Sequence, residues 1–259
     1  MLLAIDVGNT NITFAVFDGD NFHVDWRVST YARRTGDEYA GLLLTLFEEQ
    51  GLSFAQINGV VISSVVPATV DALLRFSRRH LKVDSPLVLS HDTDLGIKVN
   101  YFPASDVGAD RLANAFAAHA KYGGKLIVVD FGTATTLDAV SEDGEYLGGA
   151  IAPGIEISLE ALFSKAARLT GVQIVAPSKA IGDTTAGSLQ SGIIFGFAGQ
   201  VDALVDRFQV EMGGGAKVIA TGGLADVIAE QSRTIELCDE LLTLEGLRLI
   251  YNRVRGYKS

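Results

Sequence analysis

A short segment near the start of the chain recurs 124 residues later, and this internal repeat constrains the fold more than any other feature. Residues 3–10 read LAIDVGNT, and residues 127–134 read IVVDFGTA. At the same spacing, Ala15-Val16 lies over Ala139-Val140. Each copy predicts a buried strand that ends in an aspartate, a glycine turn with small polar residues, and a returning strand. The repeat favours a duplicated domain whose two aspartate loops face each other and could grip a polyphosphate, although two unrelated hairpins would also produce it.

Along the rest of the chain, predicted strands and helices alternate, which is the pattern of an α/β fold. We expect strands at residues 2–7, 12–17, 22–28, 59–62, 125–130, 133–140, 146–151 and 217–220. We expect helices at residues 37–50, 67–80, 106–122, 155–168, 185–212, 224–230 and 241–255. A chain of 259 residues has room for two domains, which we place at residues 1–117 and 118–259.

The formal net charge of −10 argues against a non-specific binder of nucleic acid or of an anionic membrane, because either would need a basic surface. The chain has one cysteine, Cys238, which excludes an intramolecular disulfide and a metal site built from several cysteines. Asp6 interrupts the first apolar run, and no window approaches about 18 uninterrupted apolar residues, so we predict neither a signal peptide nor a membrane span. These features predict a cytoplasmic protein with no nucleic-acid or membrane partner.

Glycine-rich loops with small polar residues suit phosphate, because glycine lets a ligand approach the backbone while neighbouring amides and hydroxyls donate hydrogen bonds. The first glycine loop, residues 6–13, reads DVGNTNIT. Its Asp6 ends a predicted strand, where a carboxylate suits Mg²⁺ held directly or through water. The alternative for this loop is an ordinary polar hairpin turn.

Two further glycine loops belong to the second half of the chain. The second glycine loop, residues 130–136, reads DFGTATT, although Thr135 and Thr136 could equally be ordinary strand residues. The third glycine loop, residues 221–225, reads TGGLA between a predicted strand and a predicted helix. Its amides would face outward at a positive helix end and could pack against a nucleotide base or sugar. A tight strand-to-helix turn without a ligand is equally compatible with these residues.

Residues 106–114, DVGADRLAN, begin a predicted helix with Asp106 as a candidate N-cap. Asp110 and Arg111 then lie near the first turn, in a setting of glycine and alanine that leaves room for a ligand. Such an aspartate could accept a proton from a substrate hydroxyl, and such an arginine could pair with a carboxylate. The alternative is an aspartate favoured by the helix dipole beside a solvated Arg111.

A more specific signal comes from the order and spacing of several segments along almost the whole chain. They are residues 6–13, 62–67 (ISSVVP), 108–114, 130–136, 148–154 (GGAIAPG), 181–182 with Thr185 and 190–192 (QSG), 221–225 and 244–247 (LEGL). Together they resemble the type III pantothenate kinase family, a branch of the acetate and sugar kinase/Hsp70/actin superfamily. The resemblance implies two similar ribonuclease-H-like (actin-like ATPase) domains, each a mixed sheet flanked by helices, with a cleft between them. It also implies a homodimer.

The resemblance further implies an ATP-dependent kinase that phosphorylates pantothenate at its 4′ hydroxyl, the first step of coenzyme A biosynthesis. It assigns ATP binding to Asp6, Val7, Gly8, Asn9, Thr10, Asn11, Ile12, Thr13 and Thr133. It makes Asp110 the catalytic proton acceptor, and it matches pantothenate contacts to Tyr101, Gly108, Ala109, Asp110, Arg111 and Thr185. Asp6 would lie near Mg²⁺ or a similar divalent cation, and Asp130 would bind a monovalent cation, K⁺ or NH₄⁺.

Two departures from the family pattern concern the pantothenate contacts. Pro103 stands one place earlier than expected after Tyr101, and Asp183-Thr184 replaces the expected Arg-Asn type of pair before Thr185. A related superfamily kinase for another small hydroxyl substrate is therefore a competing interpretation. A non-catalytic, transcription-accessory relative is another, although the predicted catalytic and cation-binding aspartates are all present.

Overall fold

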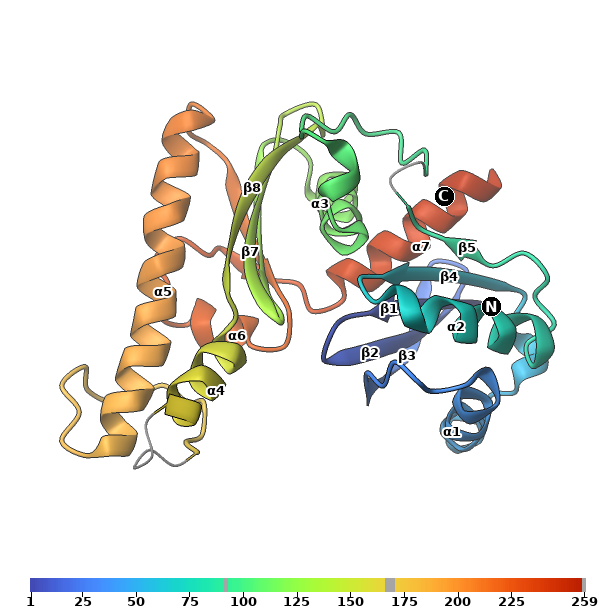
Figure 1. Ribbon diagram of the computed structural model, residues 1–259. Helices are drawn as coiled ribbons and strands as arrows, with labels where there is room; N and C mark the ends of the chain where they lie inside the picture. The colour runs from blue at the N-terminus through green and yellow to red at the C-terminus, as the bar shows by residue number, and fades with distance from the viewer. Residues whose placement is uncertain (91–92, 166–170, 258–259) are drawn as a thin grey trace. The chain divides into compact units, whose positions relative to one another are not determined.

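The computed structural model describes residues 1–90, 93–165 and 171–257, and the chain divides into two compact units (Figure 1). Unit 1 consists of Met1–Gly96, Phe102–Ala117 and Thr243–Ser259, and unit 2 consists of Ile97–Tyr101 and Ala118–Leu242. The chain therefore returns to unit 1 after it has completed unit 2. The C-terminal segment, which the sequence-based division assigns to the second domain, thus belongs to unit 1.

Unit 1 is built on a five-stranded mixed sheet with the strand order β3-β2-β1-β4-β5. Its strands are β1 (Leu2–Val7), β2 (Asn11–Asp18), β3 (Asn21–Ser29), β4 (Gly59–Ser64) and β5 (Leu87–Val88). Strand β1 pairs antiparallel with β2 and parallel with β4. Because parallel strands run in the same direction, the carboxyl ends of β1 and β4 meet at one edge of the sheet.

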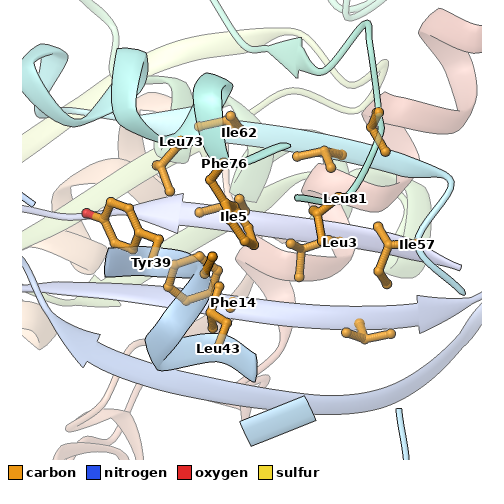
Figure 2. Packing of buried hydrophobic residues seen from close by; sticks show 14 of the residues in the cluster. Leu3, Ile5, Phe14, Tyr39, Leu43, Ile57, Ile62, Leu73, Phe76 and Leu81 are labelled. Atoms are coloured by element: carbon orange, nitrogen blue, oxygen red, sulfur yellow. The ribbon is translucent and has the colours of Figure 1, made fainter. Parts of the chain in front are cut away.

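One face of this sheet carries the hydrophobic core of unit 1 (Figure 2). Alternate β1 residues, among them Leu3 and Ile5, pack there with Phe14 and with apolar residues of helices α1 (Gly36–Glu49) and α2 (Pro67–Arg79). Each such Leu, Ile or Phe that is fully buried stabilises the fold by about 1.5–3 kcal/mol. Helix α1 begins with a capping box, in which the side chains of Thr35 and Glu38 each accept the other's backbone amide.

The opposite face of the sheet packs against helix α7 (Leu242–Arg255). Tyr251 lies so close to Gly59 of β4 that a Cβ on this glycine would be 2.4 Å from the tyrosine Oη. Arg248 forms an ion pair with Asp20 in the turn between β2 and β3. These contacts explain why α7 belongs to unit 1 although it follows unit 2 in the sequence.

Helix α3 (Ala109–Tyr122) starts three residues later than the sequence predicts. Residues Ala104–Asp106 form a short 3-10 turn, so Asp106 ends this turn and does not cap α3. The carbonyl of Gly108 accepts the first helical hydrogen bond, from the amide of Leu112 at 3.2 Å, which makes Gly108 the N-cap residue. Helix α3 packs closely on α7, since a Cβ on Gly246 would lie 2.4 Å from the carbonyl oxygen of Ala113.

Unit 2 contains a second five-stranded mixed sheet, with the order β10-β9-β6-β7-β8. Its strands are β6 (Leu126–Phe131), β7 (Ala134–Val140), β8 (Tyr146–Pro153), β9 (Lys217–Thr221) and β10 (Leu237–Cys238). Its helices are α4 (Ile155–Lys165), α5 (Thr185–Glu211) and α6 (Ala225–Ala229). The core of unit 2 joins Ile127 and Val129 of β6 to Ile194 and Val201 of α5 and to Ile228 of α6.

The two sheets repeat one topology, which confirms the duplication that the sequence indicates. Strands β1 and β6 have the same pattern of burial, and so do β2 and β7 over the length of β7. The hairpin registers differ, because Asp6 pairs with Thr13 whereas Asp130 pairs with Thr136. The second turn is therefore one residue shorter, and the predicted alignment of Ala15-Val16 with the second copy is wrong by one residue.

The longer predicted strands and helices are confirmed to within three residues at each end that the structure describes. The predicted end of one helix at residue 168 lies outside the described residues. The two-residue strands β5 and β10 are not predicted, because so short a segment shows no periodicity. Across the described ranges, no helix combines the length and the apolar character that crossing a membrane requires.

Candidate active site

The first glycine loop joins β1 to β2 in unit 1 and is held in a tight turn. The amide of Gly8 donates to the carbonyl oxygen of Asn11 at 2.9 Å, which closes the turn. Thr30, directly after β3, donates its hydroxyl to the Gly8 carbonyl at 2.7 Å and its amide to the Thr10 carbonyl at 2.8 Å. Asn9 and Thr10 are exposed at the tip. Neighbouring residues therefore impose the shape of this turn, and its tip is presented to solvent.

Asp6 stands near the end of β1 between two residues that carry hydroxyl groups. In the sheet register, it pairs with Thr13 of β2 and with Ser63 of β4, and paired residues project from the same face. Asp6 is half-buried, whereas Ser63 is completely buried and its Oγ has no hydrogen-bond partner among the described residues. A carboxylate flanked by hydroxyls is an oxygen-donor set that suits Mg²⁺ and its bound waters.

The start of α3, also in unit 1, holds the predicted catalytic aspartate. A Cβ on Gly108 would lie 2.4 Å from Oδ1 of Asp110, so glycine is required for this position of the carboxylate. The amide of Arg111 donates to the same oxygen at 2.8 Å and orients it. Arg111 itself is only 7% exposed, so the alternative of a solvated arginine is wrong. An oriented carboxylate can accept a proton, and the guanidinium of the following residue can pair with an acidic group.

In unit 2, the second and third glycine loops converge on Asp130. A Cβ on Gly222 would lie 2.6 Å from Oδ1 of Asp130, and the φ of +94° at Gly222 also favours glycine. A Cβ on Gly154, which follows β8, would lie 2.2 Å from the carbonyl oxygen of Thr133. Three backbone segments thus approach one another closely around a carboxylate. Carboxylate and carbonyl oxygens are the ligands that hard cations prefer.

The threonines of the second glycine loop have different environments. Thr133 lies half-buried in the turn, and Thr136 lies half-buried in β7. Thr135 is completely buried in β7, and its Oγ1 has no hydrogen-bond partner among the described residues. The interpretation of Thr135 and Thr136 as strand residues is therefore confirmed, and Thr133 is the threonine that the turn itself presents.

The third glycine loop continues into a very short helix. The amide of Ala225 donates to the carbonyl oxygen of Gly222 at 3.1 Å at the start of α6. Helix α6 spans only Ala225–Ala229, one residue less at each end than predicted. Because a macrodipole needs many aligned peptide units, the predicted attraction of a ligand to a positive helix end has little support here.

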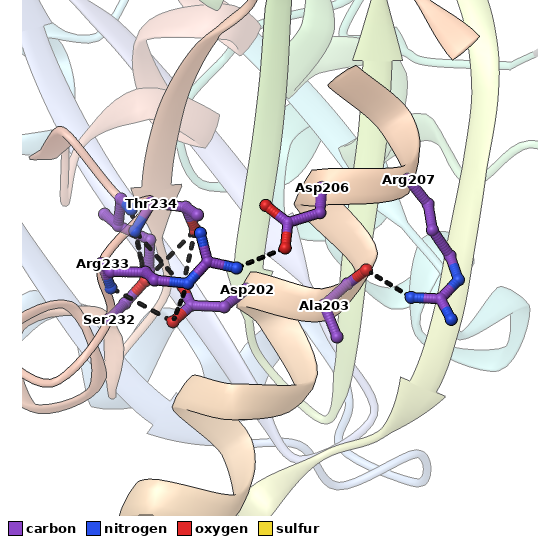
Figure 3. A network of polar contacts seen from close by, with 8 residues as sticks. Asp202, Ala203, Asp206, Arg207, Ser232, Arg233 and Thr234 are labelled. Atoms are coloured by element: carbon purple, nitrogen blue, oxygen red, sulfur yellow. Dashed lines mark hydrogen bonds and ion pairs between the residues drawn. The ribbon is translucent and has the colours of Figure 1, made fainter. Parts of the chain in front are cut away.

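Beyond α6, a network of polar contacts joins residues 232–234 to helix α5 (Figure 3). Asp202 of α5 accepts hydrogen bonds from the hydroxyls of Ser232 at 2.6 Å and Thr234 at 2.7 Å. It also accepts the amides of Arg233 and Thr234, each at 3.2 Å. Burial raises the pKa of Asp202, but these hydrogen bonds together lower it by more, so this pKa lies below its usual range. Arg233 extends the network through an ion pair with Asp206.

The two other predicted pantothenate contacts, Tyr101 and Thr185, belong to unit 2, whereas Gly108, Ala109, Asp110 and Arg111 belong to unit 1. The ring centroid of Tyr101 lies 6.4 Å from that of the buried Tyr146, whose hydroxyl donates to the buried Asp138 at 2.7 Å. Thr185 is exposed at the first position of α5, directly after the N-cap residue.

In the part of the chain that the structure describes, no group of three or more His, Cys, Asp or Glu residues is placed to hold a metal ion. Kinases commonly bind Mg²⁺ through one or two carboxylates together with waters and substrate phosphates. Asp6 with its hydroxyl neighbours fits that arrangement. Sequence reasoning gave no role to Ser63 or Gly154, although both lie in segments, 62–67 and 148–154, that carry the family resemblance.

Two sheets of one repeated topology, each with an aspartate near the end of its first strand and a glycine turn after that strand, define a protein of the actin-like class with paired ribonuclease-H-like domains. Two solved structures share this fold. A protein described as a Baf family transcriptional activator from Campylobacter jejuni matches with a TM-score of 0.62 and 20% identity over 98% of this chain and 99% of that one. The activator of the 2-hydroxyisocaproyl-CoA dehydratase from Clostridium difficile, with bound ADPNP, matches with a TM-score of 0.56 and 14% identity. This match covers 98% of this chain and 96% of that one.

Sequence similarity narrows this class to one family. The pattern that defines type III pantothenate kinase matches residues 2–207. A type III pantothenate kinase from Moorella thermoacetica is 49% identical over 98% of this chain and 99% of its own length. Another from Geobacter sulfurreducens is 50% identical over 98% of this chain and 100% of its own length. The chain belongs to the type III pantothenate kinase family.

Proposed function

We propose that this chain transfers the γ-phosphoryl group of ATP to the 4′ hydroxyl of pantothenate, the first step of coenzyme A biosynthesis. The observation that carries the proposal is the identity of 49–50% to type III pantothenate kinases along nearly the whole chain. The protein is accordingly a transferase that uses ATP and a divalent cation. The matched range includes the segments in which the candidate site residues lie, so we prefer pantothenate over another small hydroxyl compound as the substrate.

We assign ATP binding to residues 6–13 of the first glycine loop and to Thr133 of the second. Phosphoryl transfer depends mainly on positioning and on neutralising the charge of the phosphoryl oxygens. The first loop suits this task because Thr30 holds its turn in shape before any ligand binds, so its amides are preorganised donors. Mg²⁺ beside Asp6 would neutralise part of the charge on the transferred phosphoryl group.

Asp110 is the proposed proton acceptor for the 4′ hydroxyl. The Arg111 amide orients its carboxylate at 2.8 Å without any substrate, so the acceptor is preorganised. In a loose transition state the proton leaves late, and Asp110 therefore has to orient the hydroxyl more than to act as a strong base. Arg111 would pair with the pantothenate carboxylate. We assign the other pantothenate contacts to Tyr101, Gly108, Ala109 and Thr185.

The proposal includes a monovalent cation, K⁺ or NH₄⁺, at Asp130. Its support is the close approach of Gly222 to both the Asp130 carboxylate and the Phe131 carbonyl oxygen, since a Cβ on Gly222 would lie 2.6 and 2.7 Å from these oxygens. The proposal also includes a homodimer, because the family resemblance implies one. It includes a cytoplasmic location, because ATP is the phosphoryl donor. Gel filtration with light scattering tests the dimer.

The proposed function is tested by measuring ATP consumption that depends on pantothenate, with Mg²⁺ and with or without K⁺. We expect 4′-phosphopantothenate as the product, faster turnover with K⁺, and no turnover in Asp110→Asn, whose ATP affinity stays near that of the wild type. Asp106→Asn is the matched control, because Asp106 is exposed in the 3-10 turn just before α3 and should keep full activity. Near-normal turnover in Asp110→Asn would remove Asp110 from its role, and use of a sugar in place of pantothenate would refute the substrate.

A further inference from the structure

Ser63 carries a buried hydroxyl group that the fold itself does not use. The residue is 0% exposed, and its Oγ makes no hydrogen bond to any residue that the structure describes. The next residue differs, because the Oγ of Ser64 accepts the amide of Val66 and donates to its carbonyl, both at 3.0 Å. Burying a hydroxyl without a partner costs free energy. A hydroxyl at position 63 therefore calls for a reason other than packing.

The sheet register places this hydroxyl beside the proposed magnesium ligand. Strands β1 and β4 are adjacent and parallel, and Ser63 pairs directly with Asp6. Ile62 lies in the core on one face, whereas Gly59 meets Tyr251 on the other, so Ser63 projects from the face of Gly59. Asp6 projects from the same face, and adjacent strands are only about 4.8 Å apart. A hydrogen bond from the Ser63 hydroxyl to the Asp6 carboxylate therefore needs only side-chain rotation.

We propose that Ser63 is a positioning residue for Asp6, and that its hydroxyl donates a hydrogen bond to the Asp6 carboxylate when this carboxylate binds the hydrated Mg²⁺ of MgATP. The inference rests on the proposed function, in which Asp6 lies next to Mg²⁺. The hydrogen bond from Ser63 would fix one oxygen of the Asp6 carboxylate and so orient this carboxylate for the ion. Ser63 contributes to the nucleotide complex, where its hydroxyl is satisfied, and not to the unliganded fold.

The experiment measures ATP binding by calorimetry, with and without Mg²⁺ and without pantothenate, together with thermal unfolding of the unliganded protein. The variants are Ser63→Ala, Asp6→Asn and the double variant. Ser77→Ala is the matched control, because Ser77 is equally buried but its Oγ donates to the Leu73 carbonyl at 2.8 Å. We expect Ser63→Ala to weaken MgATP about tenfold, which corresponds to about 1.4 kcal/mol, and to leave metal-free ATP binding unchanged.

Two further results are expected. Ser63→Ala should melt no lower than the wild type, whereas Ser77→Ala should melt lower and keep its MgATP affinity. In the Asp6→Asn background, Ser63→Ala should cause no additional loss of affinity, because Ser63 acts through Asp6. Wild-type MgATP affinity in Ser63→Ala, or an equal loss in both backgrounds, would overturn the inference whatever the melting temperature. Wild-type protein that does not bind MgATP at all would instead refute the proposed function, and the inference with it.

Discussion

The Asp202 network allows a stability prediction whose size follows from the structure. The Asp202 side chain accepts four hydrogen bonds, from Ser232, Arg233 and twice from Thr234, and the residue is 9% exposed. A hydrogen bond contributes about 1 kcal/mol, and one to a charged group contributes more. In Asp202→Ala, water can reach some of the abandoned donors, because the segment 231–234 is near the surface. The expected loss of unfolding free energy is therefore about 3 kcal/mol, and not the sum of four full bonds.

A loss of this size should lower Tm by about 6–12 °C for a chain of this length. Thermal unfolding followed by circular dichroism at pH 7 measures it. Asp206→Ala is the matched control, because Asp206 lies one turn further along α5 and its contact with Arg233 is an exposed ion pair. Such pairs contribute little, so the Tm of this control should stay close to that of the wild type.

The same network predicts how the effect depends on pH. The pKa of Asp202 in the folded protein lies below its usual range, so its charge stabilises the fold above the unfolded-state pKa. This stabilisation is lost as the pH falls through the folded-state pKa. The difference in Tm between the wild type and Asp202→Asn should therefore be largest near neutrality and shrink below about pH 4. A Tm of Asp202→Ala within about 2 °C of the wild type at pH 7 would refute the stability prediction. A Tm difference between the wild type and Asp202→Asn that stays the same in acid would refute the pH prediction.

Two pairs of substitutions test how unit 2 is packed. Gly154→Ala places a Cβ 2.2 Å from the Thr133 carbonyl, so the second glycine loop must shift; we expect kcat/KM for ATP to fall at least about 100-fold. Gly199→Ala, in open space on α5, should keep activity and gain about 0.5–1 kcal/mol of stability. Tyr146→Phe removes the 2.7 Å hydrogen bond to the buried Asp138 and should cost about 2 kcal/mol in a denaturant titration. Tyr122→Phe should cost less, because Lys121 still binds Asp239 at 2.8 Å, and equal losses would contradict this account.

The sequence predicts the elements that carry their own periodicity and misses those that depend on distant partners. The strand alternation of residues 2–7 and the apolar stripe of residues 67–79 are visible locally, and both elements are confirmed. The predicted start of α3 is wrong because Asp106 has a side chain that suits an N-cap residue, and the local sequence gives no reason to reject it. It loses that role to Gly108, whose lack of a side chain leaves room for the Asp110 carboxylate.

The residues of the candidate site likewise fall into some that the sequence predicts and some that it misses. Asp6, Asp110 and Asp130 are recognisable from the short motifs around them. The roles of Ser63 and Gly154 are not, because each depends on a neighbour that the fold brings from another segment. Ser63 lies beside Asp6 only through the β1–β4 register, and Gly154 meets Thr133 only through the end of β8. The place of α7 in unit 1 likewise depends on Gly59 and Asp20, which lie more than 180 residues earlier in the chain.

The return of α7 to unit 1 has a consequence for synthesis on the ribosome. The strands β1 to β4 of unit 1 emerge before unit 2, but one face of their sheet meets α7, whose residues emerge only after residue 241. Most of unit 2 is one continuous segment, Ala118–Leu242, which precedes α7 in the chain and therefore emerges before it. Unit 1 therefore acquires its last element only after the residues of unit 2 have emerged. Until then, the surface around Gly59 that Tyr251 later covers is open to solvent and to chaperones.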